Sequence, residues 1–123
     1  MAIYEDVRRI GMAFPEVEEA SSYRGMPGLK VRGRPFCRLW SPREHERDGV
    51  ADTPVLVVFC DQDAKESLIR ASGGVLFETP HYEGYGAVLI RLADVSLDDL
   101  RTYLEWSYRL RAPKRLARRL DAT

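Results

Sequence analysis

The chain has 123 residues, of which 45% are hydrophobic and 31% are charged, and this size and balance fit one ordinary folded domain. Its 19 basic and 19 acidic side chains give a net charge of zero. No segment approaches the ~18 consecutive apolar residues of a membrane span, and the N-terminal residues lack the apolar stretch of a signal peptide. We therefore expect one cytoplasmic domain, residues 1–123, without membrane contact.

The first part of the chain predicts one helix and the start of a sheet. Apolar residues recur at helical spacing over residues 3–14, and Pro15 closes this amphipathic helix. A polar connection rich in Gly and Pro follows, and residues 29–40 predict a β-hairpin that turns near Arg32, Gly33 and Arg34.

The middle of the chain predicts a loop, a strand and a helix. Residues 41–53 are hydrophilic and indicate a long loop. The apolar run 54–60 is rich in valine and too short for a typical helix, which predicts a central strand. Residues 61–74 begin with acids suited to a helix N-terminus and end at two glycines, which predicts a second helix.

The last third predicts a second hairpin and a long helix. Strands at 75–79 and 87–92 flank a turn that contains Gly84 and Gly86. Ser96 can cap a helix over residues 97–111, whose first turn carries two aspartates and whose apolar residues follow at helical spacing. Pro113 interrupts this helix, and residues 114–120 can form one or two further turns.

The order of these elements predicts the fold class. Hairpins with short turns lie between amphipathic helices, and no repeated strand–helix–strand crossover pattern is present. We expect an α+β fold with two layers, in which an antiparallel sheet has its helices packed on one face. The helices of residues 3–14 and 97–111 are expected to share that face, where Trp106 extends the apolar side of the second helix and presses on the sheet.

The turn length of the first hairpin decides which side chains face the core. A two-residue turn places Phe36 on the same face as Leu29 and Val31, with Arg38 following it and with Lys30 and Arg32 on the other face. A three-residue turn instead gathers basic and aromatic side chains on one open face: Lys30, Arg32, Phe36, Arg38 and Trp40. We favour the two-residue turn, because a sheet covered on one side must bury Phe36.

Neither the cysteines nor the histidines predict a cofactor or a metal ion. Cys37 and Cys60 are far apart in apolar, strand-like segments, which is typical of buried free thiols. His45 and His81 are also far apart and have no cysteine pair nearby, whereas zinc requires three or four ligands. We therefore predict no cofactor, no metal site and no catalytic residue.

Basic residues are concentrated at the C-terminal end. The segment "RLRAPKRLARR", residues 109–119, contains six basic residues and no acid. A row of arginines there can contact successive phosphates without reading sequence, or it can simply solvate a helix end and complement its dipole. The candidate nucleic-acid contacts are Lys30, Arg32, Arg111, Lys114, Arg115, Arg118 and Arg119.

The turn "TPHYEGYG", residues 79–86, is the second candidate site. Proline, glycines and tyrosines at these positions are sufficient to build a tight turn packed on a sheet. A binding role would use His81 as an anion contact and the tyrosine rings as stacking surfaces, whereas a general base would need an orienting partner that the sequence does not reveal. The candidate pocket residues are Arg38, His81, Tyr82 and Tyr85.

Three fragments in this order resemble the MmcQ/YjbR family of small bacterial proteins: "YRGMPGLKVRGRPFCRLW", "FETPHYEGYGAVLIRL" and "WSYRLRAPKRLA". The resemblance covers essentially the whole chain. It implies an α+β fold related in shape to frataxin-like proteins and, as proposed for some relatives, nucleic-acid binding, but it implies no established reaction.

Three functions remain open from the sequence. The first is a non-enzymatic protein that binds nucleic acid weakly and without sequence specificity. The second is a small-molecule-binding protein or enzyme with a pocket near His81, Tyr82 and Tyr85, and the third is a protein–protein adaptor. A monomer or a small homo-oligomer is expected.

Overall fold

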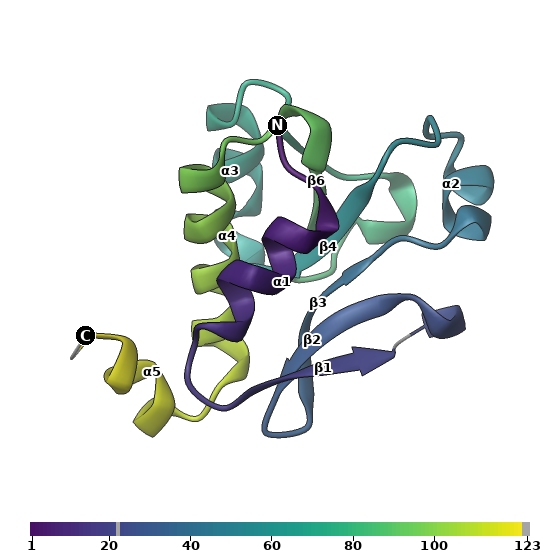
Figure 1. Cartoon of the computed structure of the whole chain (residues 1–123). Helices are drawn as coiled ribbons and strands as arrows, with labels where there is room; N and C mark the ends of the chain where they lie inside the picture. Colours follow the sequence, from purple (N-terminus) through teal and green to yellow (C-terminus); the bar gives the residue numbers. More distant parts are fainter. Residues whose placement is uncertain (22, 122–123) are drawn as a thin grey trace.

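The computed structural model of the protein describes residues 1–21 and 23–121 and contains a six-stranded antiparallel sheet in the order β1-β2-β3-β4-β6-β5 (Figure 1). The strands are β1 (Val17–Ser21), β2 (Pro27–Val31), β3 (Arg34–Leu39), β4 (Val55–Phe59), β5 (Leu76–Phe77) and β6 (Ala87–Arg91). The α-helices are α1 (Tyr4–Met12), α2 (Pro42–Asp48), α3 (Lys65–Ala71), α4 (Leu97–Arg111) and α5 (Lys114–Asp121). Short 3-10 helices are η1 (Tyr23–Gly25), η2 (Gln62–Ala64), η3 (Pro80–Tyr82) and η4 (Leu92–Asp94).

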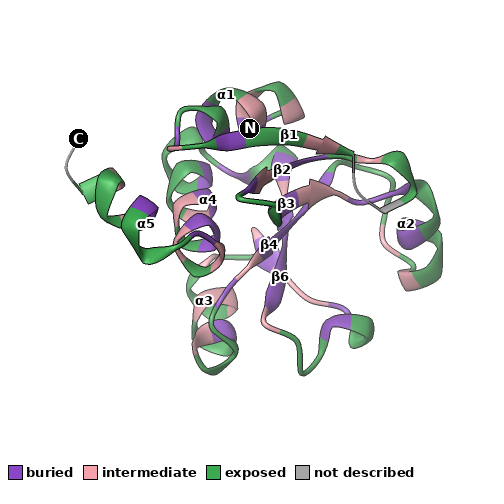
Figure 2. Cartoon of the chain, turned by 90° about the horizontal axis from the view of Figure 1, so that it is seen from below, coloured by how far each residue is buried: buried purple, intermediate pink, exposed green. Residues whose placement is uncertain are grey.

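The main core lies between one face of the sheet and the helices α1, α3 and α4. Val7 of α1 and Leu104 of α4 are fully buried against strand residues such as Leu56 and Ile90. Figure 2 colours much of β4 and β6 as buried, together with parts of α1 and α4. This arrangement confirms the predicted α+β fold, with the first helix and the long C-terminal helix on the same face.

Local sequence signals explain the position of α4. The Ser96 hydroxyl accepts a hydrogen bond from the Asp99 amide at 3.1 Å and so caps the helix start. Leu100, Leu104 and Tyr108 then recur on one side and are fully buried. Between them Ser107 joins two strands, because its hydroxyl accepts from the Phe59 amide and donates to the carbonyl of Phe36.

The β2–β3 hairpin has the predicted two-residue turn. Val31 pairs with Arg34, and Arg32 and Gly33 between them have φ angles of 51° and 79°, as a tight hairpin turn with left-handed central residues requires. Phe36 is fully buried in the same cluster as Leu29 and Val31. The prediction for Phe36 is therefore confirmed.

The prediction that Arg38 follows Phe36 onto the core face is wrong. The register shifts between Leu29, which pairs with Cys37, and Lys30, which pairs with Pro35. Phe36 is thus an extra residue in β3, a β-bulge that reverses the alternation of the side chains after it. Arg38 consequently lies beside Val57 on the face away from α1 and α4.

Two elements of the structure were not predicted from the sequence. The polar connection contains β1, an edge strand whose residues Glu18 and Glu19 are exposed, so it lacks an apolar pattern. The hydrophilic loop 41–53 contains α2, which covers little apolar surface but begins with a capping box between Ser41 and Glu44, with Pro42 at its first position. The pattern Ser-x-x-Glu, with a proline directly after the serine, is the signal in the sequence that could have predicted α2.

The packing predicted for Trp106 is wrong. The side of α4 that faces the sheet carries Leu104, Ser107 and Tyr108, whereas Trp106 is 39% exposed. Its ring packs on Tyr103, with centroids 5.4 Å apart, and lines a shallow groove toward α3. The indole therefore covers the edge of the helix layer.

A second, smaller core lies on the opposite face of the sheet. Its buried members are Trp40, Val55, Val57, Tyr82, Ala87 and Leu89. Helix α2 and the η3 turn border this cluster, which positions the candidate pocket.

Within residues 1–21 and 23–121, no helix combines the length and the apolar character needed to cross a membrane.

Candidate ligand pocket and basic surface

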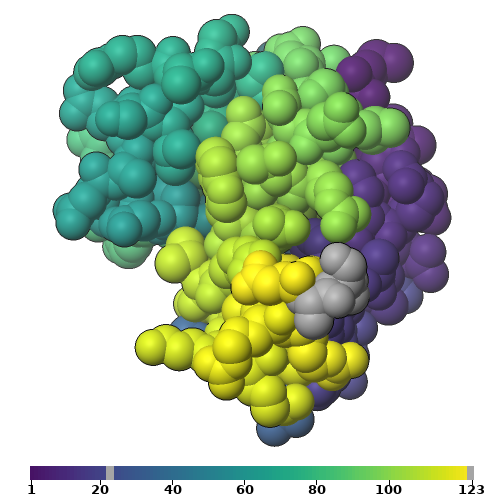
Figure 3. Space-filling view, turned by 90° about the vertical axis from the view of Figure 1, so that its left-hand side faces the viewer, coloured from purple at the N-terminus to yellow at the C-terminus, as the bar shows by residue number. Residues whose placement is uncertain are grey.

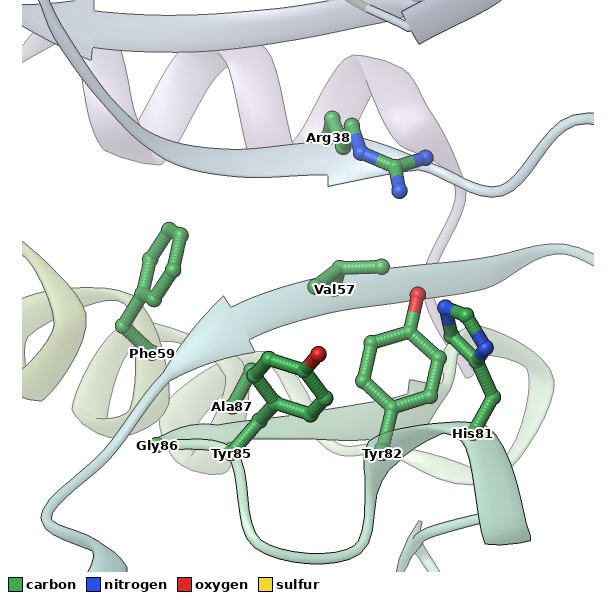
Figure 4. A pocket seen from close by; sticks show the side chains of 8 residues that line it. All are labelled: Arg38, Val57, Phe59, His81, Tyr82, Tyr85, Gly86 and Ala87. Atoms are coloured by element: carbon green, nitrogen blue, oxygen red, sulfur yellow. The ribbon is translucent and has the colours of Figure 1, made fainter.

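The four candidate pocket residues from the sequence line one pocket of about 360 Å³ on the second face of the sheet (Figure 4). Arg38 comes from β3, and His81, Tyr82 and Tyr85 come from the turn before β6. Strand residues that the sequence did not assign complete the lining: Val57, Phe59, Gly86 and Ala87. The floor is thus apolar, and aromatic rings and one guanidinium group form the walls.

Arg38 is held by a two-point ion pair. Its Nη1 donates to Glu44 Oε1 at 2.7 Å and its Nη2 to Glu44 Oε2 at 2.8 Å. Burial opposes both charges, but the mutual hydrogen bonds prevail, so the pKa of Arg38 is raised and the pKa of Glu44 is lowered. Glu44, which is 3% exposed, also accepts from the Ser41 amide at 2.9 Å. Much of the Arg38 charge is therefore neutralised inside the protein.

The Tyr82 hydroxyl connects the turn to β3 and α2. It accepts from Trp40 Nε1 at 2.9 Å and donates to Glu44 Oε2 at 3.4 Å. Burial raises the pKa of Tyr82, and the hydrogen bond from Trp40 only partly offsets this effect. The ring wall of the pocket is consequently fixed by a neutral, hydrogen-bonded tyrosine.

His81 and Tyr85 form the exposed rim of the pocket. Their rings are nearly parallel, with an interplanar angle of 23° and centroids 6.5 Å apart, and Tyr85 is 62% exposed. The His81 ring also meets Tyr82 edge-on at 5.5 Å. Figure 4 shows both rings at the same side of the pocket, across from Arg38.

A buried lysine holds the backbone of this turn in place. The ammonium group of Lys65, on α3, donates to the carbonyls of Tyr82 and Tyr85 at 2.8 Å each and to that of Ala87 at 3.2 Å. It also lies 3.1 Å from the carboxylate of Glu78. Lys65 was not identified as a site residue from the sequence. Its one side chain nevertheless holds the backbone of the turn before and after the rim.

A further contact joins α2 to the turn. The Thr79 hydroxyl donates to Asp48 Oδ2 at 2.7 Å, and Arg47 binds the other oxygen of this carboxylate at 2.7 Å. Hydrogen bonding from Arg47 is the main reason that the pKa of Asp48 is lowered. Residues near both ends of α2 therefore contact the elements that border the pocket.

The remaining cysteine and histidine groups have structural environments. Cys37 and Cys60 are free and buried, as predicted, and burial raises the pKa of Cys37 to about 12. His45 packs edge-on against Trp40, and its Nδ1 lies 2.9 Å from the Ala51 carbonyl. In the described part of the chain, His, Cys, Asp and Glu side chains form no group of three suited to a metal ion.

The basic residues from two distant segments meet at one carboxylate. Glu16 lies 3.4 Å from Arg32 of the hairpin turn, 3.6 Å from Arg115 and 3.4 Å from Arg119. Figure 3 shows α5 (yellow) across one end of the molecule. Three of the candidate nucleic-acid contacts, Arg32, Arg115 and Arg119, thus meet at one carboxylate.

Other cations extend this basic surface, defined here as Arg32, Arg34, Arg111, Lys114, Arg115, Arg118 and Arg119. The pKa of Arg111 is lowered, first by burial and then by the nearby charge of Arg34. The exposed side chains of α5 form two stripes at i, i+4 spacing, Lys114 with Arg118 and Arg115 with Arg119, opposite the buried Leu116. Lys30 is further along β2 and lies 3.9 Å from Glu18.

The comparisons with known proteins agree with this fold. A family model described as YjbR matches residues 12–110. Uncharacterized protein Rv2570 of Mycobacterium tuberculosis and Uncharacterized protein Mb2600 of Mycobacterium bovis are each 34% identical to the chain over 122 residues, which cover 94% of this chain and 93% of the relative. Neither name states an activity.

A solved structure has a similar fold. The crystal structure of Deinococcus radiodurans protein DR2400, family-model domain DUF419, matches with a TM-score of 0.68 and 21% identity, covering 89% of this chain and 78% of that chain. Since the family model spans most of the sequence and the mycobacterial relatives match nearly all of it, the chain belongs to the YjbR family, as the three fragments indicated.

Proposed function

We propose that this protein binds nucleic acid weakly and without sequence specificity through the basic surface. The observation that carries the proposal is the meeting of Arg32, Arg115 and Arg119 at the single carboxylate of Glu16. An excess of guanidinium groups over carboxylates is the arrangement that phosphate contacts require.

The charge pattern of α5 supports the same function. Like charges at i, i+4 spacing destabilise a helix, and α5 contains two such pairs next to each other. Arg34 and Arg111 add a further pair of nearby like charges at the hairpin end. A polyanion relieves this repulsion, because its phosphates neutralise the arginines, and each phosphate that an arginine neutralises releases a counterion condensed on the nucleic acid.

The test compares duplex DNA binding by the parent and by R115Q/R118Q/R119Q, using fluorescence anisotropy over a range of salt concentrations. Glutamine is chosen because glutamate beside Glu16 would add repulsion and disturb the fold. Each lost phosphate contact should reduce the magnitude of the slope of log affinity against log salt by roughly 0.9 on duplex DNA. The control is R9Q/R43Q/R70Q, which removes three exposed arginines from α1, α2 and α3.

The control protein should bind as the parent does. Absence of salt-dependent binding by the parent near physiological ionic strength would exclude the proposed function. Equal binding by R115Q/R118Q/R119Q and the parent would place the contacts elsewhere and remove the observation on which the proposal rests.

A second candidate function is the binding of a planar small molecule in the pocket. The observation that favours it is the pair of nearly parallel rings of His81 and Tyr85 above an apolar floor. Such a ligand should raise the melting temperature with little dependence on salt, whereas a phosphate-driven complex should weaken steeply as salt is added.

A further inference from the structure

We propose that the pocket binds one unpaired base of a nucleic-acid strand whose phosphates lie on the basic surface. This inference rests on the proposed function and adds two features to it: a preference for single-stranded segments and a site for the base itself. It combines the pocket and the basic surface, which were alternative candidate sites in the sequence analysis.

The two sites are connected by direct contacts. The guanidinium carbon of Arg111 lies 4.3 Å from the centroid of the Phe59 ring, and Phe59 lines the pocket. Arg111 also donates from Nε to the Pro35 carbonyl at 2.9 Å, next to Arg34. Arg111 ends α4 and Lys114 begins α5, so Arg111 supplies a cation next to both α5 and the pocket residue Phe59 for a strand that spans the two sites.

The shape of the pocket suits a flat ring. Its volume of about 360 Å³ lies near the lower end of ligand pockets, which span roughly 300–1,000 Å³. The rings of His81 and Tyr85 differ in plane by only 23°, so one planar group can lie against both. Every base has an aromatic face, and for this reason stacking on such rings is tolerant of sequence.

The charges around the pocket favour a base over a phosphate at this position. The guanidinium of Arg38 already binds both oxygens of Glu44, which offsets its charge. The Tyr82 hydroxyl is also engaged, with Trp40 and Glu44. Val57, Phe59 and Ala87 supply apolar surface, so the pocket offers stacking area, whereas the charge needed for the backbone lies outside it.

The probes are a blunt duplex, the same duplex with a short unpaired overhang, and a nucleoside monophosphate as competitor. The overhang carries 2-aminopurine, a fluorescent base whose emission is quenched when it stacks. The parent should bind the overhang about tenfold more tightly than the blunt duplex and should quench the 2-aminopurine. The monophosphate should compete only weakly, because it lacks the contacts along α5.

Three variants test which aromatic ring is responsible for the overhang preference and the quenching. Tyr85→Ala should abolish the preference and the quenching without changing affinity for the blunt duplex, since this exposed ring contributes little to the fold. Tyr85→Phe keeps the ring and should retain both signals. Trp106→Ala removes an exposed aromatic ring from the groove toward α3 and should bind as the parent does.

The outcomes separate this inference from the proposed function. If the parent binds blunt and overhanging DNA equally with a steep salt dependence, or if Tyr85→Ala keeps the preference, the pocket inference is wrong and the basic surface stands. If the monophosphate competes as well as the strand does, the pocket is a small-molecule site and the inference is also overturned. If no nucleic acid binds at all, both proposals are excluded.

Discussion

Arg38 of β3 and Glu44 of α2 form an ion pair with two hydrogen bonds, of 2.7 and 2.8 Å, which ties α2 to the second face of the sheet. The same carboxylate accepts from the Ser41 amide and from the Tyr82 hydroxyl. Glu44 thus joins the start of α2, the strand β3 and the rim turn at one buried group.

Glu44→Gln should lower the free energy of unfolding by about 2 to 3 kcal/mol, somewhat less than the loss of a fully buried partner, because the Arg38 side chain retains 20% exposure. Urea denaturation measures this effect. Glu46→Gln on the exposed side of the same helix is the matched control and should change stability by less than about 0.5 kcal/mol. Equal stability of the two variants would contradict the role given to Glu44.

The lowered pKa of Glu44 predicts acid sensitivity. A carboxyl group whose pKa is depressed in the folded state stabilises the protein fully above its ordinary value, 4.5 for Glu44, and this contribution is lost as the pH falls through the lowered value. The free energy of unfolding should therefore decrease below about pH 4.5 and should do so less steeply in Glu44→Gln. Parallel curves for the two proteins would show that Glu44 has an ordinary pKa.

Lys65→Met should destabilise the rim turn. The substitution removes the donor that the carbonyls of Tyr82, Tyr85 and Ala87 share. Since Tyr82 still accepts from the Tyr85 amide and each unsatisfied buried acceptor costs about 1–3 kcal/mol, the expected loss is about 2–4 kcal/mol. Amide hydrogen exchange should accelerate first in residues 78–86. Arg70→Met, on the exposed side of α3, is the control, and similar exchange in both variants would refute this assignment.

Trp106→Ala should cost only about 1 kcal/mol, because the indole is 39% exposed and lies at the edge of the helix layer. Leu104→Ala, two residues earlier and fully buried, should cost about 2–5 kcal/mol. Chemical denaturation of the two variants under the same conditions measures the two losses in the free energy of unfolding. A larger loss for Trp106→Ala than for Leu104→Ala would restore the core position expected from the sequence.

The sequence alone determined the elements whose signals are local. Ser96 and the apolar residues after it define α4, and the valine-rich run defines β4. The tight turn at Arg32 and Gly33 placed Phe36 in the core. These features depend on neighbours a few residues away, so hydrophobic periodicity and capping were sufficient to predict them.

Tertiary structure alone decided which distant side chains meet. The β-bulge in β3 turned Arg38 toward the pocket, and packing of α5 near the hairpin end gathered Arg32, Arg115 and Arg119 around Glu16. Trp106 and Tyr108 lie two positions apart on one helix, yet only Tyr108 faces the sheet. A one-residue change in register or a small rotation of a helix reverses such outcomes, and the free energy that fixes them comes from contacts between segments far apart in the sequence.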